Sequence, residues 1–265
     1  MLYYPQLLTG SISQYPVSRT STRRTITNTL PDGTNIRTSD DGAAEVGWDL
    51  TYSHLTDAEA GAIETLFESV CGTWQTFTFL DPTDNLLIWS EDLSQSAWEK
   101  DPLVSLVPGA QDPRGGTAGS VVTNTAQASQ QVWQRLAVPG WYQYCLSAYV
   151  LAAQATPFEL YATNGSDEFH TDYVASTSWT RVSFPVELNS HVDGLDAGIR
   201  LAAGQSVTLF GLQLEAQLGA GGYKKTRDRG GVYPQARFNQ DVLQTASTYI
   251  NQNSCSVKIL SNTAG

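Results

Sequence analysis

Three aromatic residues lie in polar stretches of this sequence, a setting in which a ring can bind ligands at a surface. They are Trp133, Tyr161 and Phe169. Exposed rings bind sugars by stacking on their apolar C–H faces while polar neighbours orient the hydroxyls, and the same rings also fill hydrophobic cores. The three residues are therefore candidates for carbohydrate contact. Packing in a core or at an interface is the alternative for each.

Two pairs of adjacent carboxylates, Glu91–Asp92 and Asp167–Glu168, are of the residue type that glycoside hydrolysis needs. That reaction requires two carboxyl groups flanking one sugar bond. Neighbouring residues of a strand point to opposite faces of its sheet, so neither pair has this geometry. Acids far apart in the sequence remain an alternative, but the G-x-S-x-G, H-E-x-x-H and phosphate-loop motifs are absent from the sequence. We therefore predict that the protein is not an enzyme.

Charge is distributed unevenly along the 265 residues, whose net charge is −11. Residues 224–265 hold six basic and two acidic side chains, a net charge of +4, which leaves −15 for residues 1–223. An acidic body is poorly suited to binding nucleic acid phosphates, so we expect no sequence-specific nucleic acid partner. The basic end is predicted to fold and to pack against the acidic part, with a nucleic-acid arm as the alternative.

Nothing in the sequence predicts insertion into a membrane. No run of residues approaches the roughly 18 apolar positions that a transmembrane helix needs. The first ten residues also lack the basic region and apolar core of a signal peptide.

The composition and the first third of the chain predict a mainly β fold with one helix. Only 15% of the residues are charged, while Thr, Ser, Gly and aromatic residues are plentiful, which favours strands and turns. Thr56 and Glu59 form a capping box ahead of apolar residues at helical spacing, so a helix is predicted over about residues 56–71. The strand before this helix shows a period of two, typical of a half-buried strand, with these residues on its apolar side: Val46, Trp48, Leu50, Tyr52 and His54.

From about residue 86 the sequence changes to short alternating runs. Turn signals such as Pro-Gly, Gly-Gly and Asn-Gly separate these runs. Many short strands at such spacing predict an antiparallel sandwich of about 130 residues.

Residues 44–82 and the C-terminal run ARFNQDVLQTASTYINQNSCSVKIL resemble the first domain of bacteriophage distal tail proteins, a family of the tail tip and baseplate hub. The first stretch contains an aromatic strand and then LTDAEAGAIETLFESVCGTWQTFTFLDP, which is a capped helix, a second aromatic strand and an Asp-Pro. The resemblance implies a discontinuous ring domain, a β-sandwich or barrel with one helix, built from residues 1–86 and 224–265.

The middle of the chain is similar to the jelly-roll, carbohydrate-binding-module-like domains of phage tail proteins. The segments that carry the similarity are DNLLIWSEDLSQSAWEK, SWTRVSF and LFGLQLEAQLGAGGYKKT. The similarity implies an inserted sandwich over residues 87–223. In sugar-binding sandwiches a structural Ca²⁺ often joins the first and last strands, which suggests Glu91 and Glu215 as its ligands. Solvated surface acids are the alternative, and no other cofactor is expected.

Together the two resemblances imply a structural protein of the virion. It would be made in the host cytoplasm and would form a homo-oligomeric ring at the tail tip, usually a hexamer, that joins the tail tube protein to the hub and tip proteins. The sandwich would face outward for adhesion or docking. Negative charge in the ring lumen would repel passing DNA, and the acids predicted to line it are Asp32, Asp40, Asp41 and Glu45. The alternatives are a receptor-binding module for a host-surface glycan and a tail-associated cell-wall hydrolase.

Overall fold

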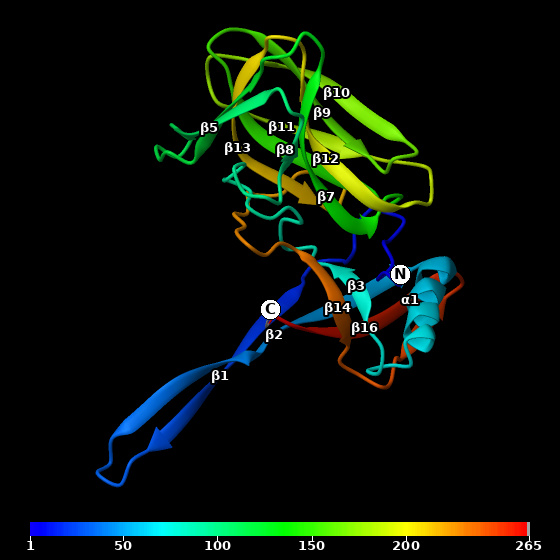
Figure 1. The fold of residues 1–265 in the computed structure, drawn as a ribbon. Coiled ribbons are helices and arrows are strands. Elements are labelled where there is room, and N and C mark those ends of the chain that lie inside the picture. Colours follow the sequence, from blue (N-terminus) through cyan, green and yellow to red (C-terminus); the bar gives the residue numbers. More distant parts are fainter. Residues whose placement is uncertain (264–265) are drawn as a thin grey trace. The chain divides into compact units, whose positions relative to one another are not determined.

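A computed structural model describes residues 1–263 and divides the chain into two compact units (Figure 1). Unit 1 contains residues 1–8, 12–79 and the C-terminal segment from residue 233. Unit 2 contains residues 9–11 and 80–232. Its long segment is thus inserted between two segments of unit 1.

Unit 2 contains two five-stranded antiparallel sheets, with strand orders β10-β9-β12-β7-β4 and β11-β8-β13-β6-β5. The predicted antiparallel sandwich is confirmed. In chain order its strands are β4 Glu99–Lys100, β5 Val104–Ala110, β6 Gly119–Asn124, β7 Gln130–Pro139, β8 Tyr144–Leu151, β9 Thr156–Thr163, β10 Glu168–Ala175, β11 Thr180–Val186, β12 Asp193–Leu201 and β13 Ser206–Glu215.

Alternating residues of these strands form the core of unit 2. Phe158, Leu160 and Ala162 of β9 are buried, as are Leu195, Ala197, Ile199 and Leu201 of β12. Burying a large apolar side chain stabilises the fold by about 1.5–3 kcal/mol, so these residues are held on the core side of each strand. Because side chains alternate along a strand, the residues between them must point outward.

The segments that enter and leave unit 2 pack along β13, which moves the unit boundaries outward from residues 87 and 223. Asn85 Nδ2 donates to the carbonyl of Leu212 at 2.9 Å, and its Oδ1 accepts from the amide of Leu214 at 2.9 Å. On the exit side, Thr226 Oγ1 donates to the carbonyl of Leu87 at 2.7 Å. Residues 80–86 and 224–232 therefore belong with the sandwich.

Unit 1 contains a six-stranded sheet of order β1-β2-β16-β14-β3, with β15 paired to β16. One helix, α1, accompanies it, and within residues 1–263 no helix is long and apolar enough to cross a bilayer. The element bounds are β1 Ser18–Thr29, β2 Asn35–Leu55, α1 Asp57–Ser69, β3 Phe77–Leu80, β14 Val232–Phe238, β15 Thr245–Tyr249 and β16 Gln252–Asn262.

The start of α1 is set by the predicted capping box. Thr56 Oγ1 accepts from the amide of Glu59 at 3.2 Å, and Glu59 Oε2 accepts from the amide of Thr56 at 2.9 Å. Ala60, Ile63 and Leu66 form its buried side. The prediction of one helix over about residues 56–71 is thus confirmed, with the helical residues running from 57 to 69.

The alternating pattern in β2 is confirmed from Val46 to Tyr52, whose apolar residues are buried. Trp48 packs against Phe79 with a centroid distance of 4.8 Å. The prediction that His54 continues this face is wrong. His54 is exposed at φ 57°, because the pairing of β2 with β16 shifts register near the end of β2.

The first part of β2, residues 35–40, and its partners in β1, residues 24–29, extend from unit 1 as a two-stranded ribbon, while residues 18–22 of β1 still lie beside the part of β2 that pairs with β16 (Figure 1). Every residue of β1 is exposed, and residues 35–39 of β2 are exposed as well. We call residues 18–41 the hairpin. Its turn is closed by Leu30, whose carbonyl accepts from the amide of Gly33 at 2.9 Å and whose amide donates to Thr34 at 2.8 Å.

Candidate functional site

The side of sheet β10-β9-β12-β7-β4 that points away from the core carries mostly polar residues. Strand alternation places them opposite the buried residues, and the pairing registers align them in rows across the sheet. We call this side the polar face. Its residues are Glu168, His170 and Asp172 of β10, Glu159, Tyr161 and Thr163 of β9, Asp196, Gly198 and Arg200 of β12, Gln131, Trp133 and Arg135 of β7, and Glu99 of β4.

One row crosses all five strands of the polar face. In order it contains His170, Tyr161, Gly198, Trp133 and Glu99, each paired with the next by register. Gly198 lies between the two rings, where a Cβ atom would come within 2.0 Å of the Val132 carbonyl and 2.7 Å of Trp133 Cα. The close approach of the strands therefore requires glycine at this position.

Arg200 is the centre of the charged network on the polar face and is only 15% exposed. Its Nη1 lies 3.0 Å from Glu159 Oε2, and its Nη2 lies 2.8 Å from Glu168 Oε2. The guanidinium lies over the Tyr161 ring, 4.8 Å from the centroid. Such charge-assisted hydrogen bonds hold planar groups in a defined orientation.

Gln131 connects the Arg200 guanidinium to the Tyr161 hydroxyl. In the amide orientation that satisfies both groups, Gln131 Oε1 accepts from Nε and Nη2 of Arg200 at 2.9 Å each. The amide nitrogen then donates to the Tyr161 hydroxyl at 2.9 Å. Burial raises the pKa of Tyr161 well above its usual value, so this hydroxyl stays protonated near neutral pH.

A second ion pair borders the row. Arg135 and Asp196 are direct cross-strand neighbours on β7 and β12. Arg135 Nε and Nη2 donate to the two carboxylate oxygens at 2.7 Å and 2.6 Å, and this bidentate contact raises the pKa of the guanidinium. The geometry fixes the carboxylate plane, although an exposed pair of this kind contributes little to stability.

The structure brings two of the three predicted sugar-contacting rings together. Trp133 and Tyr161 lie on the polar face, on either side of Gly198. The expected exposure of Tyr161 is wrong: the side chain is 1% exposed, because Arg200 and Gln131 cover it. Trp133 is half-buried, and its indole N–H is buried without a hydrogen-bond partner among residues 1–263.

Phe169 lies on the opposite side of the sheet from the two rings. It stacks on core Phe184 with a centroid distance of 5.5 Å, although 46% of it remains exposed. Its register partner on β9 is Ala162, a core residue, and not Tyr161. Phe169 therefore belongs to the edge of the core.

Sequence reasoning missed Arg200, Asp196 and Gly198. Their signal was present in the run DGLDAGIRL of β12, in which these residues alternate with Leu195, Ala197, Ile199 and Leu201. The alternation predicts a face but does not reveal which strands lie beside it.

The adjacent acid pairs are each held by separate donors. Glu91 pairs with Lys225, whereas Asp92 accepts from Ser94 Oγ at 2.5 Å. Asp167 accepts from the amides of Asn189 and Ser190, whereas Glu168 binds Arg200. Hydrogen bonds from Ser94, from Ser190 and from Arg200, respectively, lower the pKa values of Asp92, Asp167 and Glu168. A glycosidase general acid needs a raised pKa, which is the opposite direction to that of Asp92, Asp167 and Glu168.

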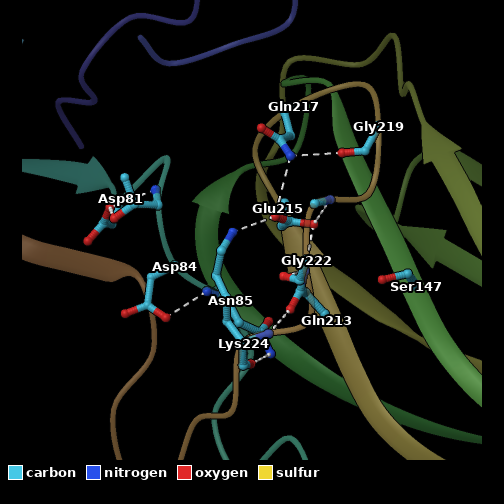
Figure 2. A network of polar contacts seen from close by, with 12 residues as sticks. Asp81, Asp84, Asn85, Ser147, Gln213, Glu215, Gln217, Gly219, Gly222 and Lys224 are labelled. Carbon is cyan, nitrogen blue, oxygen red and sulfur yellow. Dashed lines mark hydrogen bonds and ion pairs between the residues drawn. The ribbon is translucent and has the colours of Figure 1, made fainter. Parts of the chain in front are cut away.

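Each of the two predicted calcium ligands contacts a lysine in the described part of the chain. Glu215 is 1% exposed, and Lys224 Nζ lies 2.7 Å from its Oε1 (Figure 2). Gln213 Nε2 and the amide of Gly221 donate to its Oε2 at 2.7 Å and 2.8 Å. Glu91 faces the ammonium of Lys225. Each carboxylate thus faces a lysine ammonium, and residues 1–263 contain no cluster of three or more His, Cys, Asp or Glu side chains that could hold a metal ion.

Three of the four predicted lumen residues lie in the hairpin. Asp40 accepts from Arg24 Nε at 2.6 Å, Asp32 accepts from the turn amide of Thr34 at 2.9 Å, and Asp41 accepts from Ser39 Oγ at 2.6 Å. Glu45 lies further along β2, outside the hairpin. Within residues 18–41 these acids are accompanied by Arg19, Arg23, Arg24 and Arg37, so the hairpin is not uniformly acidic.

No protein-family model and no curated protein matches the chain. Solved structures with similar folds were found, each covering about half of it. A family 61 carbohydrate-binding module from a structure in complex with β-1,4-galactotriose has a TM-score of 0.36 and 14% identity, covering 49% of this chain and 97% of that one. The CBM22-1 xylan-binding domain of Paenibacillus barcinonensis Xyn10C has a TM-score of 0.41 and 18% identity, covering 53% and 99%.

A domain of a phage protein is also similar. The enzymatically active domain of bacteriophage CBA120 tailspike protein 4 has a TM-score of 0.39 and 10% identity. The match covers 52% of this chain but 22% of the tailspike chain.

Proposed function

We propose that unit 2 binds carbohydrate through its polar face. The observation that carries the proposal is the row Tyr161–Gly198–Trp133, which is bordered on both sides by fixed ion pairs. A half-buried indole offers an apolar surface to a sugar ring. Carboxylate and guanidinium groups beside it accept from and donate to hydroxyls.

Fixed orientation is what distinguishes this arrangement from ordinary surface charge. Arg200 is held by Glu159, Glu168 and Gln131, so its planar group is already ordered before any ligand arrives. A binding site whose side chains are ordered in advance loses less conformational entropy on binding. Sugars, which gain little from each hydroxyl, benefit most from such ordering.

The proposal is tested by comparing two Trp→Ala variants of the full chain. Trp133→Ala removes the indole of the polar face, and Trp141→Ala removes an indole that stacks on His191 elsewhere on unit 2. Calorimetry with β-1,4-galactotriose and affinity electrophoresis with xylan, the glycans named for the similar modules, provide the first probes. A wider glycan array follows.

Trp133→Ala is expected to weaken binding by roughly tenfold, because an aromatic contact of about 1.5 kcal/mol corresponds to about a factor of ten. Trp141→Ala is expected to bind as the wild type does. Thermal unfolding of both variants controls for folding. Equal binding by wild type and Trp133→Ala, or no bound glycan on the array, would contradict the proposal.

The hairpin favours assembly as a second function. A two-stranded ribbon with both sides exposed is marginally stable in water, and β1 is the edge strand of its sheet, a position at which another chain can add a strand. A partner that pairs with this edge would stabilise it. We propose a closed ring of this chain at a virion tail tip, contacting tail tube and hub proteins, with Asp32, Asp40, Asp41 and Glu45 toward the lumen. The hexameric number comes from the resemblance alone.

Deleting residues 22–39 tests this second function. The variant is expected to remain folded, because the core of unit 1 lies outside the deleted segment, and to lose self-association in light scattering and electron microscopy. Glycan binding through unit 2 of the monomeric deletion variant is expected to persist. Full-length protein that stays monomeric under all conditions would rule out the ring.

A further inference from the structure

We infer that the polar face accepts uncharged polysaccharide chains and rejects anionic ones. The inference rests on the carbohydrate binding proposed above and names the class of glycan that the same residues fit. It follows from how the charges of the face are already paired.

Both arginines of the polar face are neutralised from within. Arg200 contacts Glu159 and Glu168, and Arg135 contacts Asp196 through both carboxylate oxygens. An anionic sugar would have to displace one of these carboxylates, and the displaced carboxylate would then lie beside it without its partner. A neutral hydroxyl needs no such exchange, because the carboxylates keep lone pairs free to accept from it.

The remaining ionisable side chains of the face are two acids and His170, whose Nδ1 lies 3.7 Å from Glu168 Oε1. The side chains of Glu99 and Asp172 are exposed, and within residues 1–263 neither carboxylate has a hydrogen-bond or ion-pair contact, although Glu99 adds to the negative charge that raises the pKa of Arg135. Lys100, the neighbour of Glu99, projects from the other side of β4 and donates to the Val104 carbonyl at 3.1 Å. The polar face therefore has five carboxylates, Glu99, Glu159, Glu168, Asp172 and Asp196, against two guanidinium groups.

The excess of negative charge acts on an approaching glycan before any contact forms. Uronate, sulfate or phosphate groups would be repelled by the exposed carboxylates of Glu99 and Asp172 at opposite edges of the sheet. This repulsion weakens with added salt, because exposed charges are screened over about 8–10 Å at physiological ionic strength. A neutral chain experiences neither the repulsion nor its salt dependence.

The row is long and open at both ends. It runs across five strands, a span of about 19 Å at the usual strand spacing, and ends at the exposed residues His170 and Glu99. A surface of this length fits several sugar units, and its open ends fit an internal segment of a polysaccharide better than a chain terminus.

The test uses matched pairs of polysaccharides with the same backbone. The full-length protein is run in affinity gels containing hydroxyethylcellulose or carboxymethylcellulose, dextran or dextran sulfate, and xylan or glucuronoxylan, at low and high salt. At least one neutral member is expected to retard the protein. Its anionic counterpart is expected to bind at least tenfold more weakly at low salt, with a smaller difference at high salt.

The outcomes separate this inference from the proposal beneath it. Tighter or equal binding of the anionic member in a pair whose neutral member also binds would overturn the charge selectivity and leave carbohydrate binding intact. Binding of the anionic members alone would also overturn the charge selectivity and leave carbohydrate binding intact. Binding of no member, and of nothing on the glycan array, would overturn both.

Variants that remove carboxylates test whether the charges of the polar face cause the preference for neutral glycans. Glu159→Gln together with Glu168→Gln releases Arg200, so the variant is expected to gain roughly tenfold in affinity for the anionic member. Glu187→Gln, an exposed acid outside the polar face, is the matched control and should change nothing. If the double variant is unstable, Glu99→Gln with Asp172→Asn changes only exposed groups and should still narrow the difference. Unchanged selectivity in a folded variant would contradict the inference.

Discussion

The polar face of unit 2 and the hairpin of unit 1 are both antiparallel strands with polar side chains, but different structures lie behind them. Behind the polar face are buried side chains such as Leu160, Ala197 and Ile199, which fix each strand. The hairpin is exposed on both sides along β1. Cross-strand arginine–aspartate pairs occur in both, Arg135–Asp196 in one and Arg24–Asp40 in the other.

Polar residues form a binding site only where the structure behind them holds their side chains in place. The contacts are chemically the same in the two regions, but only a strand with one buried side can hold its outward residues in a fixed arrangement. The polar face is therefore suited to recognising a small, defined ligand. The hairpin is suited to a partner that supplies the missing packing when it binds.

Amide hydrogen exchange gives the largest expected contrast between the regions. Amides of β9 and β12 lie in the centre of a sheet and should open only when unit 2 unfolds, whereas hairpin amides should open locally. Protection is expected to differ by at least about a thousandfold, since global unfolding typically costs 5 kcal/mol or more. Exchange measured by NMR on dilute protein checks this. Strong hairpin protection in a monomer would break the comparison.

Substituting Gly198 by alanine tests how closely β7 and β12 are held together in the polar face of unit 2. The added Cβ would meet the Val132 carbonyl at 2.0 Å, so the strands must move apart at a cost of about 2–3 kcal/mol. Gly219→Ala is the matched control, because nothing lies within 4 Å of its Cβ position. Urea unfolding measures both. Equal stability of the two variants would mean that β7 and β12 are not held closely together.

Lys224→Met tests whether an internal ammonium performs the task that Ca²⁺ was expected to perform. The change leaves the buried Glu215 carboxylate without its cation, which should cost about 3 kcal/mol. Lys225→Met, beside Glu91, affects a more exposed pair and should cost less than about 1 kcal/mol. The melting temperature of the wild type is expected to stay the same after chelation with EDTA. A lower melting temperature after chelation would instead support a structural Ca²⁺ in the wild type.

The sequence predicted individual helices and strands far better than it predicted which strands lie side by side in a sheet. The period of two in β2 and the Thr56–Glu59 capping box are local patterns, and both were confirmed in place. The row of Tyr161, Gly198 and Trp133 comes from three strands that are distant in sequence, and its existence depends on strand order and register. No local pattern contains that information.

The same reason explains why the sequence did not predict where individual residues lie. Phe169 and Tyr161 both lie in polar stretches, yet the register of β10 on β9 places Phe169 beside Ala162 and on the core side. Glu215 became a buried partner of Lys224 only because residues 216–224 turn back on β13. In both cases the outcome was set by long-range packing, which composition does not encode.

Double-mutant cycles on the two arginine–aspartate pairs give a smaller, more precise comparison. The pairs are alike in exposure, with Arg at 67% in both and Asp at 16% in unit 2 and 20% in the hairpin. Alanine cycles at Arg135 and Asp196 should give a coupling of about 0.5 kcal/mol in global unfolding. The cycle at Arg24 and Asp40 should give about zero, because the hairpin opens before unit 1 unfolds. Equal couplings would show that the hairpin folds cooperatively with unit 1.

The pH dependence of the Glu168–Arg200 pair gives the smallest expected effect. The hydrogen bond from Arg200 lowers the pKa of Glu168 below its ordinary value of 4.5 in the folded protein. A carboxyl with a lowered folded-state pKa stabilises the fold above its unfolded pKa, and this contribution disappears as the pH falls through the folded value. Wild type should therefore exceed Glu168→Gln in stability near neutral pH, and the difference should vanish in acid. Because Glu168 is 42% exposed, solvent screening keeps the difference small. Melting curves of both proteins from pH 7 down to pH 3 measure it, with Glu187→Gln as the control. A difference that grows in acid would reverse the sign and show that Arg200 does not favour the charged carboxylate.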